Sequence, residues 1–246
     1  MIKNSNNKLI NKILFSPPCS NIYPDLQNTT KIVGTYTLNK RKGLHRVLTT
    51  LKKQKNGWTN NVGLRNPGID KCKNKSHIIS ISEINQGEFD IILEKISNLD
   101  KILGIEFNIS CPNAKISNID YRILEKARSI SNNIIIKIPH EASEYSISSL
   151  LELGDFILHI SNSKKTARGA LSGKDLVINN IRTIYNIKTR HEKRKIIAGG
   201  GIYDIETILD YKDAGADYFS LSTIMLNPLK TIKLLKDFKN LTTINR

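Results

Sequence analysis

One segment of the sequence places a thiol among amide side chains. In Asn108-Ile109-Ser110-Cys111-Pro112-Asn113, the cysteine stands beside a proline and between two asparagines. A lone cysteine is more often an inert buried residue than a catalyst. A thiol on a loop can, however, exchange a proton with a bound planar molecule. We therefore take Cys111 as the candidate acid/base group; the spacing of Cys19, Cys72 and Cys111 predicts no metal site.

A second candidate is the only charged residue in an apolar run. Lys137 lies near the end of Ile134–Ile138, which is otherwise made of isoleucine. The methylene groups of such a lysine can simply pack against apolar neighbours while its amine reaches solvent. It can also hold a cation against charge that develops on a bound cofactor during reaction. Its proximity to the other polar rim residues favours the second interpretation.

A third group could bind a phosphate through its backbone. Ala198-Gly199-Gly200-Gly201-Ile202 follows an apolar run and precedes a helix expected from Asp204, so that bare N–H groups can approach a phosphate closely. A glycine run can also be no more than a tight turn. Ser222-Thr223 follows the next predicted strand, and loops after the last two strands of a barrel commonly hold phosphate. We therefore expect a phosphate near Gly200, Gly201, Ser222 and Thr223.

Short β-type runs alternate with amphipathic segments along the chain, which is typical of βα units around a parallel sheet. Eight strands are expected, enough to close a barrel: Lys12–Phe15, Lys31–Thr35, Ile78–Ser82, Ile102–Phe107, Ile134–Ile138, Phe156–Ile160, Lys195–Ala198 and Tyr218–Leu221. Helices with apolar residues at three- and four-residue spacing are expected at Glu88–Leu99, Asp120–Ser131, Ser143–Leu153, Lys174–Thr189, Asp204–Ala214 and Pro228–Lys239. The predicted fold is an α/β (β/α)8 TIM barrel.

Two connections depart from a regular barrel. Ser20–Thr29 is too short for a full crossover helix, so the first βα unit is expected to be shortened. Asn39–His77 is long and lacks a clean helical period, as functional loops often do. Barrel ligands gather at the C-terminal strand ends. The further residues at those ends are Ser20, Gly34, Thr35, Asn162 and Ser163.

Composition fits one domain in a reducing compartment. The 246 residues, 39% of them hydrophobic, can form a single barrel domain spanning 1–246, with 1–11 expected to be disordered or peripheral. Three cysteines form no disulfide framework, and no apolar run reaches membrane-span length, so a cytoplasmic location is expected. The net charge of +16 would suit nucleic acid. Lysine, asparagine and isoleucine abound throughout, as under A/T-biased coding, which makes a nucleic-acid partner the less favoured interpretation.

Several motifs in order resemble those of dihydroorotate dehydrogenases. The segment 105–113, which contains Cys111, resembles the signature of that family, 34–43 its strand-two motif and 57–68 its substrate-loop motif. The series is completed by Lys137, Ser161-Asn162-Ser163, Leu171-Ser172-Gly173-Lys174, Gly200-Gly201-Ile202 and Leu221-Ser222-Thr223. The resemblance runs from about Phe15 to Pro228, and ordered motifs are more specific than any one of them.

The resemblance implies an FMN enzyme that oxidises dihydroorotate to orotate in pyrimidine biosynthesis. Cys111 would be the base, as in the soluble class. The positions implied to bind substrate are Asn60, Asn108, Asn113, Asn162 and Ser163. The positions implied to contact FMN are Ser20, Gly34, Thr35, Lys137, Ser172, Gly173, Gly200, Gly201, Ser222 and Thr223. A homodimer is compatible with the resemblance.

Departures from the family pattern leave two alternatives open. Soluble members commonly have a lysine where this chain has Gly34, and Ala170 replaces one glycine of a usual pair. The chain is therefore expected to be divergent and shortened, and a catalytically impaired FMN barrel is one alternative. A flavin barrel similar to tRNA dihydrouridine synthases, which share an Asn-x-x-Cys-Pro loop, is the other. The asparagine after Pro112 and the loop from Asn60 to Gly68 favour the dehydrogenase.

Overall fold

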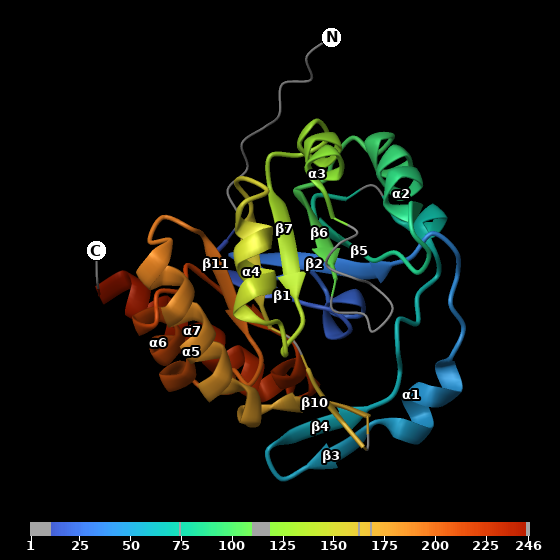
Figure 1. Ribbon diagram of the computed structural model, residues 1–246. Coiled ribbons are helices and arrows are strands. Elements are labelled where there is room, and N and C mark those ends of the chain that lie inside the picture. The colour runs from blue at the N-terminus through green and yellow to red at the C-terminus, as the bar shows by residue number, and fades with distance from the viewer. Residues whose placement is uncertain (1–10, 74, 110–118, 162, 168, 245–246) are drawn as a thin grey trace.

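The expected barrel is present (Figure 1). The computed structural model describes residues 11–73, 75–109, 119–161, 163–167 and 169–244. Eight parallel strands close in the order β1-β12-β11-β8-β7-β6-β5-β2. They are β1 (Ile13–Phe15), β2 (Thr29–Tyr36), β5 (Ile78–Ile81), β6 (Gly104–Asn108), β7 (Ile134–Ile138), β8 (Ile157–Ile160), β11 (Ile196–Gly199) and β12 (Tyr218–Leu221). Each strand lies where the sequence predicts it, with ends shifted by no more than two residues.

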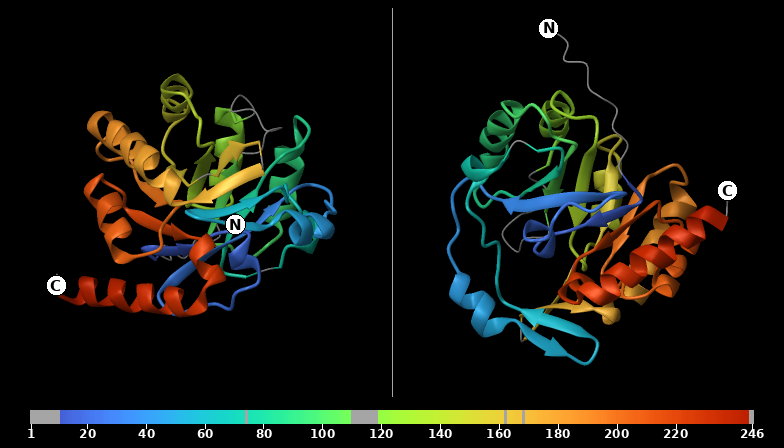
Figure 2. Two further views of the ribbon diagram at one scale, coloured as in Figure 1. Left: turned by 90° about the horizontal axis from the view of Figure 1, so that it is seen from below. Right: turned by 180° about the vertical axis from the view of Figure 1, so that it is seen from behind.

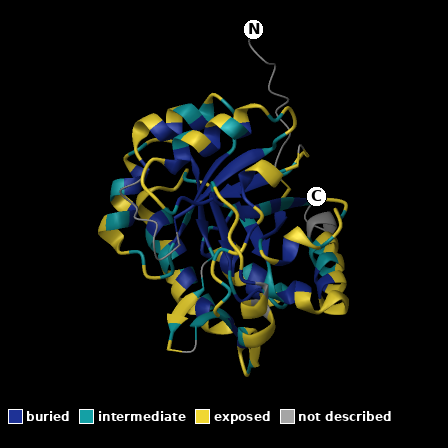
Figure 3. Ribbon diagram, turned by 90° about the vertical axis from the view of Figure 1, so that its right-hand side faces the viewer, coloured by how far each residue is buried: buried dark blue, intermediate teal, exposed yellow. Residues whose placement is uncertain are grey.

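Helices surround the barrel, as their apolar spacing predicts. They are α2 (Glu88–Ser97), α3 (Tyr121–Arg128), α4 (Glu144–Leu151), α5 (Val177–Arg190), α6 (Ile205–Asp213) and α7 (Pro228–Ile244). Three begin at a residue whose side chain accepts a backbone N–H three positions later, namely Asp120, Ser143 and Asp204. Figure 3 shows buried strands at the centre and exposed residues on the outer faces of the helices. Within the part of the chain described, no helix is both long and apolar enough to cross a membrane.

The barrel interior has an apolar layer below a polar one. Leu14, Ile32, Ile78, Ile135, Ile157 and Ile197 form one buried cluster inside the barrel. Residues two positions later on a strand point to the same face. Two positions after three of these isoleucines stand Ser80, Lys137 and His159. The strands therefore place an apolar floor inside the barrel and polar groups above it, toward their C-terminal ends.

The first βα unit lacks an α-helix, which confirms the shortened unit expected from the sequence. A single 3-10 turn, η1 (Cys19–Asn21), occupies the connection between β1 and β2. The connection after β2 contains α1 (Leu44–Thr50), β3 (Lys52–Gln54), β4 (Gly57–Asn60) and η2 (Ile69–Lys71). The connection after β8 contains β9 (Lys164–Thr166), β10 (Gly169–Gly173) and the turn η4 (Lys174–Leu176). A further turn, η5 (Thr223–Leu226), follows β12.

Two of these connections pair to form a second, small sheet that the sequence did not predict. Its order is β3-β4-β10-β9, and β4 runs antiparallel to β10. Gly57 and Gly173 face each other, and a Cβ on Gly57 would lie 1.9 Å from the Ser172 carbonyl oxygen. Because both connections leave the barrel at C-terminal strand ends, the small sheet lies beyond that mouth, as Figures 1 and 2 show.

Candidate active site

The glycine run after β11 has the backbone geometry expected of a phosphate cradle. Gly200 and Gly201 have φ values of 80° and 78°, in the left-handed region that favours glycine. A Cβ on Gly201 would lie 2.6 Å from Val177 Cγ2 and 2.7 Å from the Gly173 carbonyl oxygen. The Tyr211 hydroxyl donates to the carbonyl oxygens of Gly199 and Gly200, at 3.0 and 2.7 Å. These contacts hold the run in place beside Gly173, another residue predicted to contact FMN.

The end of β12 contributes hydroxyl groups beside η1. The Ser222 hydroxyl donates to the Pro17 carbonyl oxygen at 3.2 Å, and Thr223 begins η5. The buried hydroxyl of Tyr203 forms no hydrogen bond within the described residues, although Thr223 lies beside it, and burial raises its pKa. Burial also raises the pKa of the Cys19 thiol, against the lowering effect of its hydrogen bond with Ser222. A buried polar atom without a partner beside serine, threonine and glycine suits a ligand that accepts hydrogen bonds, such as a phosphate.

Gly34 is held at the end of β2 with no room for a side chain. The Asn21 side chain accepts from the Gly34 N–H at 2.9 Å and donates to the Gly34 carbonyl oxygen. Gly34 has a φ of 110°, and a Cβ there would lie 2.5 Å from the Ser80 carbonyl oxygen. The neighbouring Ser20 is fully buried, and its hydroxyl donates to the Ile32 carbonyl oxygen at 2.6 Å. The local backbone therefore disfavours any side chain at this position, including the lysine expected from the resemblance.

A continuous hydrogen-bonded network crosses the polar layer of the barrel. Asn108 Nδ2 donates to Thr35 Oγ1 at 2.9 Å, and Thr35 Oγ1 lies 2.9 Å from Ser80 Oγ. Ser80 donates to Glu106 Oε1 at 2.7 Å. Glu106 Oε2 in turn lies 2.6 Å from His159 Nδ1. The network joins two predicted site residues, Thr35 and Asn108, to a buried carboxylate and imidazole.

Lys137 lies beside this network on β7. The strand register places it next to Asn108 of β6 on one side and His159 of β8 on the other. Burial lowers the pKa of the Lys137 ammonium, and the Glu106 carboxylate opposes that shift. Burial alone would raise the pKa of Glu106, but His159, Lys137 and Ser80 together hold it below its usual value. Lys137 is thus a half-buried amine close to an ionised carboxylate.

The small sheet carries two further predicted residues. Asn60 ends β4 opposite Ala170, and its side-chain oxygen accepts from the Val62 N–H at 3.3 Å. The Ser172 hydroxyl donates to the Trp58 carbonyl oxygen at 3.3 Å. Ser163 follows β8 and is half-buried. These residues belong to segments that lie over the barrel mouth, on the same side as Lys137 and the glycine run.

Three predicted residues, Cys111, Asn113 and Asn162, lie outside the described residues. The described chain leads to the first two from β6, which ends at Asn108. The Ile109 N–H then donates to the Lys137 carbonyl oxygen at 3.2 Å. The connection that contains Cys111 therefore starts next to Lys137.

His159 is a fully buried core residue, hydrogen-bonded to Glu106 through Nδ1. Glu106 itself was missed as a member of the polar layer. The sequence did contain a signal for it. Glu106 stands two positions before Asn108 on a buried strand, so its carboxylate must lie on the same face as that asparagine.

Proteins with similar sequences are named dihydroorotate dehydrogenases. The catalytic subunit of dihydroorotate dehydrogenase B (NAD(+)) from Malacoplasma penetrans is 24% identical over 220 residues, covering 75% of this chain and 72% of that protein. The catalytic subunit of the same name from Oceanobacillus iheyensis is 25% identical over 217 residues, covering 74% and 71%. A putative dihydroorotate dehydrogenase A (fumarate) from Aquifex aeolicus is 23% identical over 224 residues, covering 75% and 72%. No model of a protein family matches the sequence.

The fold is also found in a solved structure. A DHODH from Eimeria tenella, in complex with ferulenol, superposes with a TM-score of 0.65 at 15% identity, covering 87% of this chain and 76% of that chain. The matched sequence relatives cover about three quarters of this chain, and the barrel is the one predicted from its sequence. The chain is therefore a divergent relative of the dihydroorotate dehydrogenases.

Proposed function

We propose that this protein is a cytoplasmic, single-domain FMN enzyme that oxidises dihydroorotate to orotate. The observation that best supports the proposal is that two groups of residues lie at the same end of the barrel. The glycine run of β11 and the polar layer around Lys137 both face the C-terminal mouth of one barrel. In such barrels the catalytic groups and bound phosphates are found at that mouth.

Residues of the cradle match the donor chemistry that FMN requires. Gly200 and Gly201 offer backbone N–H groups, and Ser222, Thr223 and Tyr203 offer hydroxyls, for the phosphate. Ser20, Gly34, Thr35, Ser172 and Gly173 are the further proposed contacts. FMN, when bound, would accept the hydride that leaves C6 of dihydroorotate.

Lys137 would act on the pyrimidine end of the flavin. Its amine lies at the mouth, where a positive charge stabilises electron density gained on reduction. A cation placed in this way requires little reorganisation during the reaction, because the strand register already positions the residue.

Cys111 would remove the proton from C5 of dihydroorotate as the hydride leaves C6. Asn60, Asn108, Asn113, Asn162 and Ser163 would hold the substrate. Amide side chains suit this role because each offers a donor and an acceptor to the carboxylate and the ring. Support for the role of Asn108 comes from its bond to Thr35, which fixes the side chain at the barrel mouth.

The test is formation of orotate by FMN-saturated protein supplied with dihydroorotate and an artificial electron acceptor. We expect turnover that requires FMN. A protein that binds FMN but forms no orotate would instead be the catalytically impaired barrel. Dihydrouridine formation in tRNA, lost at high salt, would favour the tRNA dihydrouridine synthase alternative.

A further inference from the structure

Three neighbouring strands place titratable groups inside the barrel. Glu106 on β6, Lys137 on β7 and His159 on β8 lie in the polar layer, and Glu106 and His159 are 1% and 0% exposed. The other strands contribute only uncharged groups to this layer, among them Ser80 of β5, Thr35 of β2 and Ser220 of β12. In the described part of the chain, these three groups therefore set the charge of the interior.

The Glu106 carboxylate is fixed in orientation by a donor on each oxygen. Ser80 donates to Oε1 at 2.7 Å and His159 contacts Oε2 at 2.6 Å. Two such bonds favour the ionised form of a buried carboxyl. A nearby cation offsets more of the desolvation cost of a carboxylate built into a barrel interior.

His159 is not that cation. Its Nδ1 is bonded to Glu106, and its Nε2 is buried without a hydrogen-bond partner among the described residues. A protonated imidazole would place an unpaired N–H donor at Nε2, whereas the neutral form leaves only an acceptor there. Burial accordingly lowers the pKa of His159 despite the opposing effect of Glu106. Lys137 lies two positions after Ile135, the register partner of Glu106, so the two side chains share a face on adjacent strands. Lys137 is therefore the cation nearest in the fold to this carboxylate, and its charge lowers the pKa of Glu106.

We propose that Glu106, oriented by Ser80 and His159, is the built-in counter-ion that keeps Lys137 cationic at the barrel mouth. Glu106 is thus a positioning residue that acts through Lys137, and its effect on a flavin rests on the proposed function. His159 contributes as a neutral donor that holds the carboxylate.

The first test uses flavin-free protein, so its outcome does not depend on the proposed function. A pH titration of protein labelled with ¹³Cε-lysine, followed by NMR, gives the midpoint pH for protonation of Lys137. The Lys137 resonance is identified as the one that is lost in Lys137→Met. We expect Glu106→Gln to lower that midpoint by about one pH unit, because removal of a nearby opposite charge from a buried site shifts a pKa by about that amount. Ser80→Ala, which removes one donor and is milder for folding, should shift it in the same direction by less.

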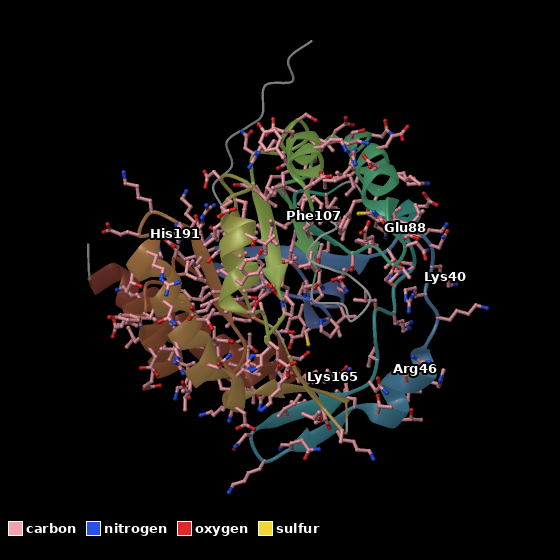
Figure 4. All side chains as sticks on the ribbon, in the orientation of Figure 1. Lys40, Arg46, Glu88, Phe107, Lys165 and His191 are labelled. Carbon is pink, nitrogen blue, oxygen red and sulfur yellow. The ribbon has the colours of Figure 1, made fainter. Side chains whose placement is uncertain are left out.

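Glu88→Gln is the matched control. Glu88 is also a buried carboxylate, with donors from Ile84 N–H and Asn85, but it lies at the start of α2 outside the barrel (Figure 4). It should leave the Lys137 midpoint unchanged. An unchanged midpoint in both Glu106→Gln and Ser80→Ala, or an equal shift in Glu88→Gln, would overturn the proposal.

The second test measures the midpoint potential of bound FMN against pH. In Glu106→Gln the potential should fall as pH rises through the lowered midpoint of Lys137, because the reduced flavin loses its cation. That extra inflection should disappear in the double variant with Lys137→Met. An inflection that persists without Lys137, or parent and variant curves of equal shape, would contradict the proposed action through Lys137.

Discussion

Position 34 shows how the backbone around one residue can exclude a side chain. A side chain at Gly34 would meet the Ser80 carbonyl oxygen at 2.5 Å, and its φ of 110° disfavours any other residue. The absent lysine is thus part of a different local structure, in which Asn21 binds the Gly34 backbone.

We predict that Gly34→Lys destabilises the protein and does not improve FMN binding. Strained backbone of this kind costs about 1–3 kcal/mol before the clash is counted. Thermal unfolding and FMN titration measure the two effects. Tighter FMN binding at unchanged melting temperature would show that the lysine is tolerated after all.

The proposed role of Cys111 as the base gives a prediction about the rate of dihydroorotate oxidation. Cys111→Ala should slow flavin reduction by dihydroorotate by about 10²–10⁴-fold, the usual contribution of a general base. FMN affinity should stay the same, since the thiol serves proton transfer. Cys72→Ala is the control, because Cys72 follows η2, outside the β6–α3 connection that carries Cys111. Rapid-mixing absorbance measures the rate of flavin reduction in each variant, and flavin titration measures FMN affinity. Equal reduction rates in Cys111→Ala and the parent would contradict the role of Cys111 as the base.

Some residues of the site could be predicted from sequence and others could not. The left-handed turn at Gly200 and Gly201 could be predicted, because a glycine run between an apolar strand and a helix indicates backbone that favours glycine, as the φ values of 80° and 78° confirm. The pairing of Glu106 with His159 could not be predicted, since it joins β6 to β8 across β7 and the sequence does not give the register of these strands. A period-two pattern gives the face of a residue but not its partner across the barrel.

At the scale of elements, the turn after β11 should determine FMN affinity. Gly201→Ala would place a Cβ 2.6 Å from Val177 Cγ2 and 2.7 Å from the Gly173 carbonyl oxygen. We expect FMN affinity to fall at least about tenfold, the equivalent of 1.4 kcal/mol, because the backbone donors must shift.

Gly215→Ala provides the control for backbone strain. Gly215 also has a left-handed φ, 104°, but lies between α6 and β12, away from the mouth. It should lower stability without changing FMN affinity. An equal loss of affinity in the two variants, followed by flavin fluorescence, would mean that the cradle has no specific role.

The eight barrel strands were predictable because each is a short apolar run between polar helices. The small sheet was not, for a different physical reason. β3 and β9 are short and contain lysines, and the sheet forms only when β4 pairs with β10 from a distant part of the chain. Local sequence cannot signal such pairing, because each strand is unstable alone.

At the scale of the whole molecule, the charge of +16 should act on the rate of substrate capture. Three exposed basic residues lie on this side of the molecule (Figure 4): Lys165 on β9 of the small sheet, Arg46 on α1, and Lys40 on the connection from β2 to α1. Dihydroorotate carries a carboxylate, so a basic mouth should attract it.

We therefore predict that kcat/KM for dihydroorotate falls as ionic strength rises, since at 0.1 M salt the attraction between exposed charges more than about 10 Å apart is largely screened. The neutral methyl ester of dihydroorotate is the matched comparison and should show little salt dependence. Equal salt dependence for acid and ester would assign the effect to something other than attraction of the carboxylate.

Anaerobic mixing of FMN-loaded protein with dihydroorotate tests the central claim most directly. A flavin held at the barrel mouth beside Lys137 and the Cys111 connection should lose its oxidised absorbance, with one orotate formed for each flavin reduced. Flavin that is bound at full occupancy, yet stays oxidised in excess dihydroorotate, would contradict the account.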